Sequence, residues 1–164
     1  DSDCDGSEAT GILSTQGENY DTISAALSTV SSGGTITVCD GEWTESFEIY
    51  GSVDLVSLNG PDSTTLVAEQ SLGIVEIYGG DVTIEGFTLT GGSGSDAANW
   101  GAAGGAIYIQ GGSLGLTNAV IRGNSGVIGG AIFVDEDELA PRHPGLGWLG
   151  IDSLDLTGLG ELGE

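Results

Sequence analysis

The stretch VEIYGGDVTI at residues 75–84 decides the fold, because it returns as IYIQGGSLGL at residues 107–116. In both stretches apolar residues alternate with other residues on either side of a Gly-Gly pair. Such alternation indicates strands with one buried face, and the glycines indicate a tight turn between them. Each stretch therefore predicts two short strands joined by a turn.

Two further phrases also repeat. EIYG occurs at residues 48–51 and 76–79, and GGAIYI at 104–109 returns as GGAIFV at 129–134. Successive copies start about 25 to 32 residues apart, a period typical of solenoids built from stacked repeats. The strands keep their length while the loops vary, and the longest insertion, 91–103, contains Trp100.

These repeats predict an all-β fold, a right-handed parallel β-helix solenoid of about four coils. Each coil would contribute three short strands and turn alternate apolar side chains into a narrow interior. An antiparallel β-sandwich is the alternative, since it also consists of short strands and turns. A sandwich does not by itself repeat the same strand, Gly-Gly, strand phrase, so we favour the β-helix.

A different periodicity precedes the strands and predicts an N-terminal capping α-helix. Its apolar stripe has helical spacing, Asp21 is the expected N-cap, and residues 31–34 (SSGG) end it. The stripe consists of Ile23, Ala26, Leu27 and Val30. We expect three parts: an acidic arm over 1–20, the helically capped β-helix over 21–138, and a Leu/Gly-rich cap or assembly segment over 139–164.

The charge balance excludes whole classes of partner. The 164 residues include 25 Asp and Glu, two Arg, no Lys and one His, which gives a net charge of −23. Nucleic acids and anionic lipid surfaces would repel such a chain, and no apolar run is long enough for a membrane-spanning helix. A saline habitat would also account for the acidity, because acidic surfaces keep proteins soluble in high salt.

Two cysteines, Cys4 and Cys39, are expected to form one disulfide in an oxidising compartment. The alternative is two unrelated thiols. The chain contains no Met, so we expect either a removed leader or an excised segment. Together with the acidity, these features predict a secreted or cell-surface protein.

The chain also resembles a known family. The segments GTITV at 34–38 and DGEWTE at 40–45 resemble the start of right-handed parallel β-helix domains of the pectate-lyase-like type. The GGAI phrases, with VIRGN at 120–124 between them, are similar to repeats of polymorphic outer-membrane-protein passenger domains, although Ile121 stands where that family has Phe. The resemblance covers roughly residues 20–135 and implies the fold more than the function, because this fold carries both enzymes and non-catalytic surface proteins.

Catalytic chemistry has little support in the sequence. Pectate lyases of this fold use calcium-binding carboxylates and a basic residue, for which the chain offers Arg122 and Arg142. We interpret Arg122 as a solvated surface residue, and a lone His143 makes a zinc site unfavourable. A hydrolase could use two outward carboxylates, but the sequence singles out no pair. The outward acids are Asp54, Glu76 and Glu85.

Calcium is the cofactor that the sequence supports best. The DSDCDG stretch at 1–6 has the Asp-x-Asp-x-Asp-Gly spacing that directs oxygens at one hard cation. The predicted ligands are Asp1, Asp3, Asp5 and Glu8. Ile12 stands where an EF-hand loop has Glu, so a solvated acidic terminus stays open as the alternative. A second acidic run, 135–138, is expected to be a solvated loop.

The predicted function rests on segment 139–164 and on the two ends of the predicted solenoid. A short solenoid exposes strand edges that can pair with another chain, and no Lys protects them. We therefore expect a non-catalytic extracellular structural protein, either a surface or adhesive protein or a fibre-forming subunit, which self-associates into a head-to-tail homopolymer and is stabilised by calcium. Segment 151–156 is strand-like. The predicted assembly residues are Trp148, Leu149, Ile151, Leu154 and Leu156.

The alternative function is a secreted carbohydrate-active enzyme or glycan-binding module, with Trp43, Trp100 and Trp148 available to stack on sugars.

Overall fold

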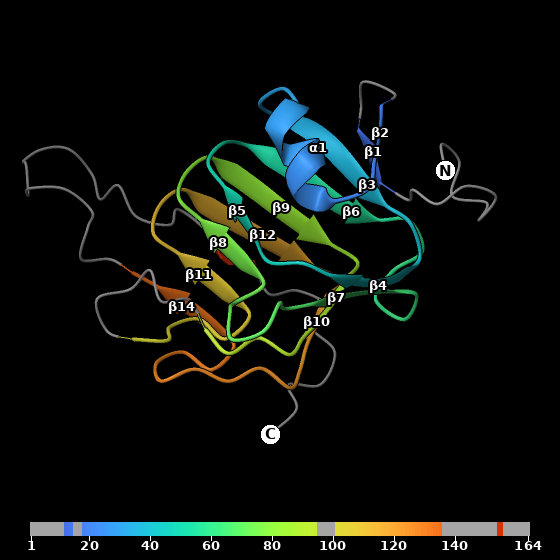
Figure 1. The fold of residues 1–164 in the computed structure, drawn as a ribbon. Helices are drawn as coiled ribbons and strands as arrows, with labels where there is room; N and C mark the ends of the chain where they lie inside the picture. The colour runs from blue at the N-terminus through green and yellow to red at the C-terminus, as the bar shows by residue number, and fades with distance from the viewer. Residues whose placement is uncertain (1–11, 15–17, 95–100, 136–153, 156–164) are drawn as a thin grey trace, which may run out of the picture.

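The computed structural model describes residues 12–14, 18–94, 101–135 and 154–155. The described residues form three sheets beside one short helix (Figure 1). Sheet 1 has the order β15 (Leu154–Asp155), β12 (Ser113–Thr117), β9 (Asp81–Glu85), β6 (Val53–Ser57), β3 (Gly34–Val38), β1 (Ile12–Ser14) and β2 (Asn19–Tyr20). Sheet 2 has the order β13 (Val120–Ile121), β10 (Thr88–Thr90), β7 (Thr64–Val67) and β4 (Gly41–Thr44). Sheet 3 has the order β14 (Ile132–Val134), β11 (Ile107–Ile109), β8 (Val75–Ile77) and β5 (Phe47–Ile49).

The chain visits the three sheets in a fixed rotation. From β3 to β14, each set of three successive strands places one strand in sheet 1, one in sheet 2 and one in sheet 3. Each new strand pairs in parallel with the strand three earlier. The prediction of a mainly β fold built from parallel strands is therefore confirmed, and the strand order is compatible with a solenoid.

The sequence repeats coincide with the strand register. Val75 and Ile77 pair with Ile107 and Ile109, as the match between the two repeated stretches predicts. Antiparallel pairing, which a β-sandwich requires, is confined among the described strands to β1 with β2 and with β3. The sandwich alternative does not account for this pattern.

Alternate side chains of the strands form the core. Along sheet 1, Ile36, Leu55, Ile84 and Leu116 are register partners, and all four are fully buried. The residues between them point to the opposite face, because successive side chains of a strand alternate. Apolar residues from all three sheets join in one cluster, which is the core expected from the sequence.

Helix α1 (Ile23–Thr29) packs against four strands, β1, β2, β3 and β5. Its N-cap is Thr22 and not Asp21, so that prediction was wrong by one residue: the Thr22 hydroxyl accepts from the Ala25 N–H at 3.1 Å. The Glu45 carboxylate, which follows β4, accepts from the N–H groups of Ile23 and Ser24 at 2.8 Å each. These bonds tie the N-terminus of α1 to the end of β4, since initial N–H groups of a helix lack internal partners.

The predicted N-terminal arm contains two strands that its polar sequence did not indicate. Within residues 1–20, β1 pairs antiparallel with β3, and Ile12 lies opposite Val38. Ile12 is fully buried. Strands β1 and β2 therefore cover one edge of sheet 1, which would otherwise present unpaired backbone groups.

Candidate functional site

A row of aromatic rings runs along sheet 3. We call Tyr50, Tyr78, Tyr108 and Phe133 the aromatic row. The Tyr50 and Tyr78 rings are stacked with centroids 5.1 Å apart and planes 13° apart. Tyr108 contacts Tyr78 edge-on at 6.4 Å and stacks on Phe133 at 6.1 Å. Tyr108 is fully buried, Phe133 is half-buried and Tyr50 is 70% exposed, so the row reaches the surface at its Tyr50 end.

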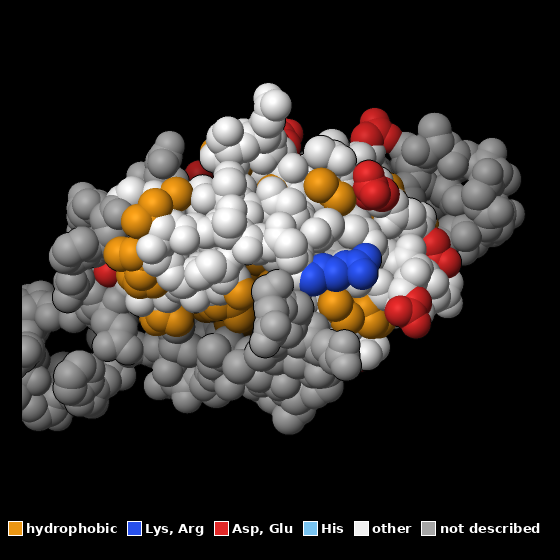
Figure 2. Space-filling view, turned by 90° about the horizontal axis from the view of Figure 1, so that it is seen from below, with side chains coloured by type: hydrophobic (Ala, Val, Ile, Leu, Met, Phe, Trp, Pro, Cys, Tyr) orange, Lys and Arg blue, Asp and Glu red, His pale blue; other side chains and the backbone are white. Residues whose placement is uncertain are grey.

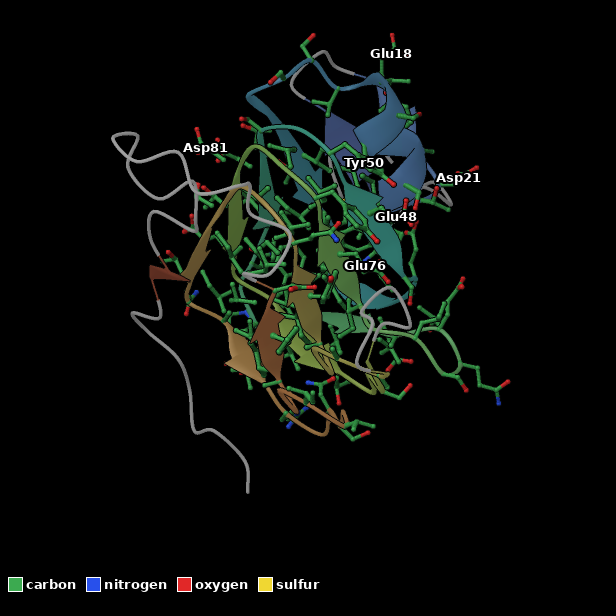
Figure 3. All side chains as sticks on the ribbon, turned by 90° about the vertical axis from the view of Figure 1, so that its left-hand side faces the viewer. Glu18, Asp21, Glu48, Tyr50, Glu76 and Asp81 are labelled. Carbon is green, nitrogen blue, oxygen red and sulfur yellow. The ribbon has the colours of Figure 1, made fainter. Side chains whose placement is uncertain are left out.

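Each tyrosine hydroxyl of the row donates to a carboxylate. Tyr50 donates to Glu48 at 2.6 Å and Tyr78 to Glu76 at 2.5 Å. The EIYG repeat accounts for both pairs, because residues two apart on a strand lie on the same face. Glu48 and Glu76 are themselves register partners on β5 and β8. Figure 3 shows Glu48, Tyr50 and Glu76 on one side of the molecule. The exposed Tyr50 ring is thus held from two sides.

The innermost tyrosine has a different partner. The Tyr108 hydroxyl donates to the Asp135 carboxylate at 2.8 Å. Asp135 is only 5% exposed, so the expectation that this residue begins a solvated loop was wrong. A buried carboxylate needs hydrogen bonds to offset its lost hydration, and Tyr108 supplies one. The rest of the acidic run, residues 136–138, lies outside the described residues.

The surroundings of the row raise the pKa of both outer phenols. Burial and the hydrogen bond to Glu76 raise the pKa of Tyr78 far above its ordinary value of 10.0. The hydrogen bond to Glu48 raises the pKa of Tyr50. The folded state therefore favours the neutral phenol. The environment of each phenol therefore stabilises the folded protein fully below about pH 10, where the phenol is neutral in both the folded and the unfolded state. This stabilisation is lost as the pH rises through the folded-state pKa of each phenol.

We expect Tyr78 to stay protonated at pH values where a free tyrosine ionises, about pH 10. Absorbance at 295 nm follows this ionisation, and the difference between wild type and Tyr78→Phe isolates Tyr78. In Glu76→Gln, which removes the negative acceptor, the midpoint is expected to fall. Far-UV circular dichroism verifies that the protein stays folded during the titration. A Tyr78 midpoint near pH 10 in the folded wild type would contradict the described contacts.

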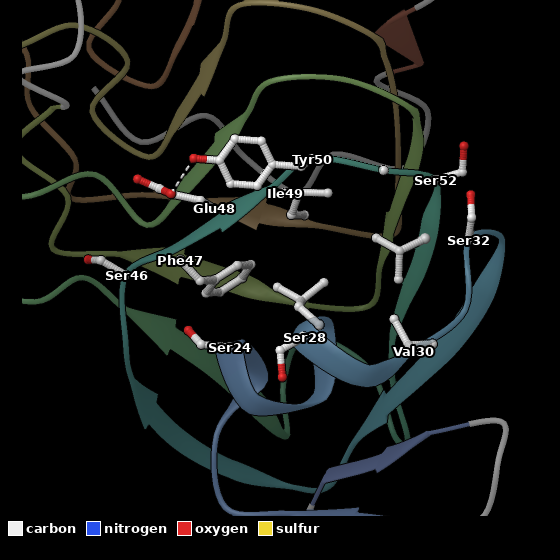
Figure 4. Close-up of a pocket in the computed structure, with 13 residues that line it drawn as sticks. Ser24, Ser28, Val30, Ser32, Ser46, Phe47, Glu48, Ile49, Tyr50 and Ser52 are labelled. Atoms are coloured by element: carbon white, nitrogen blue, oxygen red, sulfur yellow. Dashed lines mark hydrogen bonds between the residues drawn. The ribbon is translucent and has the colours of Figure 1, made fainter.

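A groove lies between α1 and the first strand of sheet 3 (Figure 4). It has a volume of about 680 Å³, within the range of ligand-binding clefts. Every residue from Ser46 to Val53 lines one side, and the exposed Ser24 and Ser28 line the helix side. Phe47 and Ile49 lie at its base and are almost fully buried, while Glu48 and Tyr50 lie on the outer side of the same strand. The groove therefore adjoins the outer end of the aromatic row.

Strand β5 is the last strand of sheet 3 on this side. The Phe47 N–H donates to the Ile74 carbonyl at 3.0 Å, and the Ile49 carbonyl accepts from the Tyr78 N–H at 2.9 Å. Both bonds face β8. Successive residues of a strand direct their backbone groups to opposite sides, so the Glu48 N–H and C=O point toward the free edge. This edge can accept another strand.

Most of the predicted site residues lie outside the described residues. These are the calcium ligands Asp1, Asp3, Asp5 and Glu8, then Cys4, and the assembly residues Trp148, Leu149, Ile151 and Leu156. Leu154 belongs to β15, which pairs in parallel with β12 in sheet 1. Arg142, His143 and Trp100 also lie outside. Within the described part of the chain, no group of three or more His, Cys, Asp or Glu is placed to hold a metal ion.

The remaining predicted residues are scattered over the molecule. Cys39 is buried, no cysteine among the described residues is free, and the pairing with Cys4 stays a prediction. Trp43 is half-buried and donates from Nε1 to the Cys39 carbonyl at 3.0 Å. Arg122 is exposed, directly after β13. Of the outward acids, Glu76 alone belongs to the aromatic row and its carboxylates.

Comparison of the chain with protein-family models, curated proteins and solved structures gave no match. The site must therefore be judged from its own chemistry. The helix in the described part of the chain has seven residues, and none that could span a membrane is found there.

Proposed function

We propose that the protein is a non-catalytic, secreted structural protein: a right-handed parallel β-helix solenoid that self-associates through its ends. One observation carries the proposal. Among the described strands, β4 ends sheet 2 on one side and β13 ends it on the other. Such strands offer unpaired backbone groups to a second copy.

Sheet 2 is the best candidate for the joint. Sheet 1 is extended by β1 and β2 at one end and by β15 at the other. Helix α1 packs mainly against sheets 1 and 3, through β3 and β5, so it leaves β4 the more accessible first strand. A head-to-tail contact would then place β13 of one copy beside β4 of the next, which repeats the parallel pairing already present within each copy.

Charge complementarity supports this joint. Arg122 is exposed beside β13, and Figure 2 shows one basic patch among the described residues of the face seen from below. Glu42 is exposed on β4 at the opposite end of sheet 2. If β13 continued the register of sheet 2, Arg122 would lie diagonally across from Glu42, within reach of a long side chain.

Calcium and the disulfide complete the proposal. Calcium would bind Asp1, Asp3, Asp5 and Glu8, and a Cys4–Cys39 bond would hold this arm near β3. The absence of a free cysteine among the described residues supports the disulfide. Both features fit an extracellular protein, since oxidising conditions and millimolar calcium are found there.

We expect wild type to form concentration-dependent assemblies, and regular filaments under the electron microscope in the presence of calcium. Sedimentation velocity should show that Glu42→Arg and Arg122→Glu each weaken association. The double variant should restore it, because the two charges exchange places. If a chelator dissolves the filaments, calcium is required for their assembly. Protein that stays monomeric at every concentration, with and without calcium, would contradict the proposal.

Deletion of residues 139–164 tests the predicted assembly segment separately. We expect the truncated chain to lose assembly if Trp148, Leu149, Ile151, Leu154 and Leu156 form part of the joint. Association that persists after the deletion but is abolished by Arg122→Glu would assign the joint to sheet 2 alone.

A glycan-binding module is the second candidate function, and Tyr50 favours it. Its exposed ring is fixed by Tyr78 and Glu48, and a fixed aromatic face can stack on a sugar. Glu48 and Glu76 on adjacent strands would accept hydroxyl hydrogen bonds. Retention on neutral polysaccharides that is lost in Tyr50→Ala would establish this function. Equal retention of wild type and Tyr50→Ala would exclude a role of this ring.

A further inference from the structure

We propose that the groove between α1 and β5 binds an extended, basic segment of another protein, which adds as a parallel or antiparallel strand to the free edge of β5. The inference does not depend on self-association, because it uses sheet 3 and not sheet 2. The proposed occupant of the groove has an extended backbone and a positive charge.

The backbone of β5 supplies the first part of the argument. Phe47 and Ile49 bond to the β8 side, which leaves the N–H and C=O of Glu48 directed at the groove. An added strand would engage this donor and acceptor together. Binding between an edge strand and a helix is a recurring mode of peptide recognition, in which backbone bonds give affinity and side-chain pockets give specificity.

The walls of the groove fit an extended chain. Its lining follows β5 and the turn after it without interruption, from Ser46 to Val53. Leu27 and Val30 line the helix side, where they pack against the core cluster that contains Phe47 and Ile49. An added strand alternates its side chains, so every second one would face the half-buried Leu27 and Val30 of the helix. We therefore expect small or β-branched apolar residues at these positions of the partner.

The negative charge beside the groove indicates which outward-pointing side chains the partner should carry. Those that point outward would lie beside Glu48 and the exposed Tyr50 ring, whose opposite face is covered by Tyr78. A carboxylate next to a free aromatic face favours an arginine or lysine, which can form an ion pair and a cation–π contact there. The net charge of −23 attracts a basic chain over longer distances.

The composition argues against a second copy as the occupant. The chain contains two Arg and no Lys. Arg122 directly follows β13, which is already paired with β10 in sheet 2. The occupant of the groove is thus a basic segment with alternating apolar residues from a different protein.

The probe is a blocked peptide of alternating valine and arginine, measured by fluorescence anisotropy with full-length protein. Two matched peptides serve as controls: one has glutamate in place of arginine, and one is N-methylated at alternate backbone nitrogens. We expect the methylated peptide to bind at least about tenfold more weakly, because it retains the charge but cannot form the strand bonds. The glutamate peptide is expected not to bind.

Protein variants locate the site. Ser28→Trp fills the groove from the exposed side of the helix and should abolish binding, while Thr29→Trp, outside the lining, should not. Glu48→Gln should weaken binding about tenfold. Circular dichroism verifies that each variant is folded. Equal binding of the methylated peptide, or unchanged binding by Ser28→Trp, would overturn the proposal. So would self-association that Ser28→Trp alone abolishes, since a second copy would then occupy the groove.

Discussion

Gly105→Ala is expected to lower the free energy of unfolding by about 3 kcal/mol or more, while Gly130→Ala changes it by less than about 0.5 kcal/mol. Both residues are the second glycine of the same GGAI phrase. A Cβ on Gly105 would lie 1.8 Å from the Gly130 carbonyl oxygen and 2.6 Å from the Ser125 carbonyl oxygen. Both are backbone atoms, so relief requires these backbone segments to move apart.

Gly130 has the same sequence context but no strand layer against it among the described residues. A Cβ there meets no atom within 4 Å. Urea unfolding followed by circular dichroism measures both variants, and an unchanged m-value verifies that the extent of unfolding is the same. Similar midpoints for Gly105→Ala and Gly130→Ala would mean that these two loops do not stack on one another.

Ile84→Ala is expected to destabilise the protein by about 2 to 5 kcal/mol. Ile84 is fully buried in sheet 1 between its register partners Leu55 and Leu116. Removing its side chain leaves a cavity that strands held on both sides cannot close easily. The milder Ile84→Val should cost about 0.5 to 1.5 kcal/mol.

Thr83→Ala is the matched control for this core position. Thr83 is the neighbouring residue on β9, but it is half-buried on the opposite face of the sheet. Its replacement should cost less than about 1 kcal/mol, since no large cavity forms. If Thr83→Ala were as harmful as Ile84→Ala, the two faces of sheet 1 would have been assigned wrongly.

The sequence predicted the register because the same side chains occupy the same place in each repeat. Glu48 aligns with Glu76 in the EIYG phrases, and these residues are partners on β5 and β8. Ile107 aligns with Ile132 in the GGAI phrases, and they are partners on β11 and β14. Alternation between buried and outward positions repeats from strand to strand within a sheet, so aligning the phrases also aligns the strands.

Features that depend on contacts distant in sequence were not predictable in this way. The helix starts after Thr22 and not after Asp21, and the carboxylate of Glu45 satisfies its first N–H groups. Strand β1 forms because β3 offers a partner, although its own segment, Ile12–Ser14, has only three residues. Asp135 is buried because the Tyr108 hydroxyl lies next to it. None of these pairings has a signal in the local pattern.

The candidate site was only partly visible in the sequence. The EIYG repeat predicted a strand and contains the whole Glu–Tyr pair, but periodicity does not reveal that successive tyrosines stack. The groove is formed by α1 and β5, which the sequence predicts separately. Their relative placement follows from packing on a shared core and not from either segment alone.

A distance measurement across sheet 1 tests the central claim, that successive coils stack in register. Thr35 and Gly115 are far apart in sequence but are linked by the register partners Asp54 and Thr83. Three strand spacings of about 4.8 Å place their backbones roughly 14 Å apart. Nitroxide labels on Thr35→Cys and Gly115→Cys, with each single variant as control for the native cysteines, should give a narrow electron–electron distance distribution near about 15 to 20 Å. A broad distribution, or one centred beyond about 30 Å, would contradict the stacked arrangement.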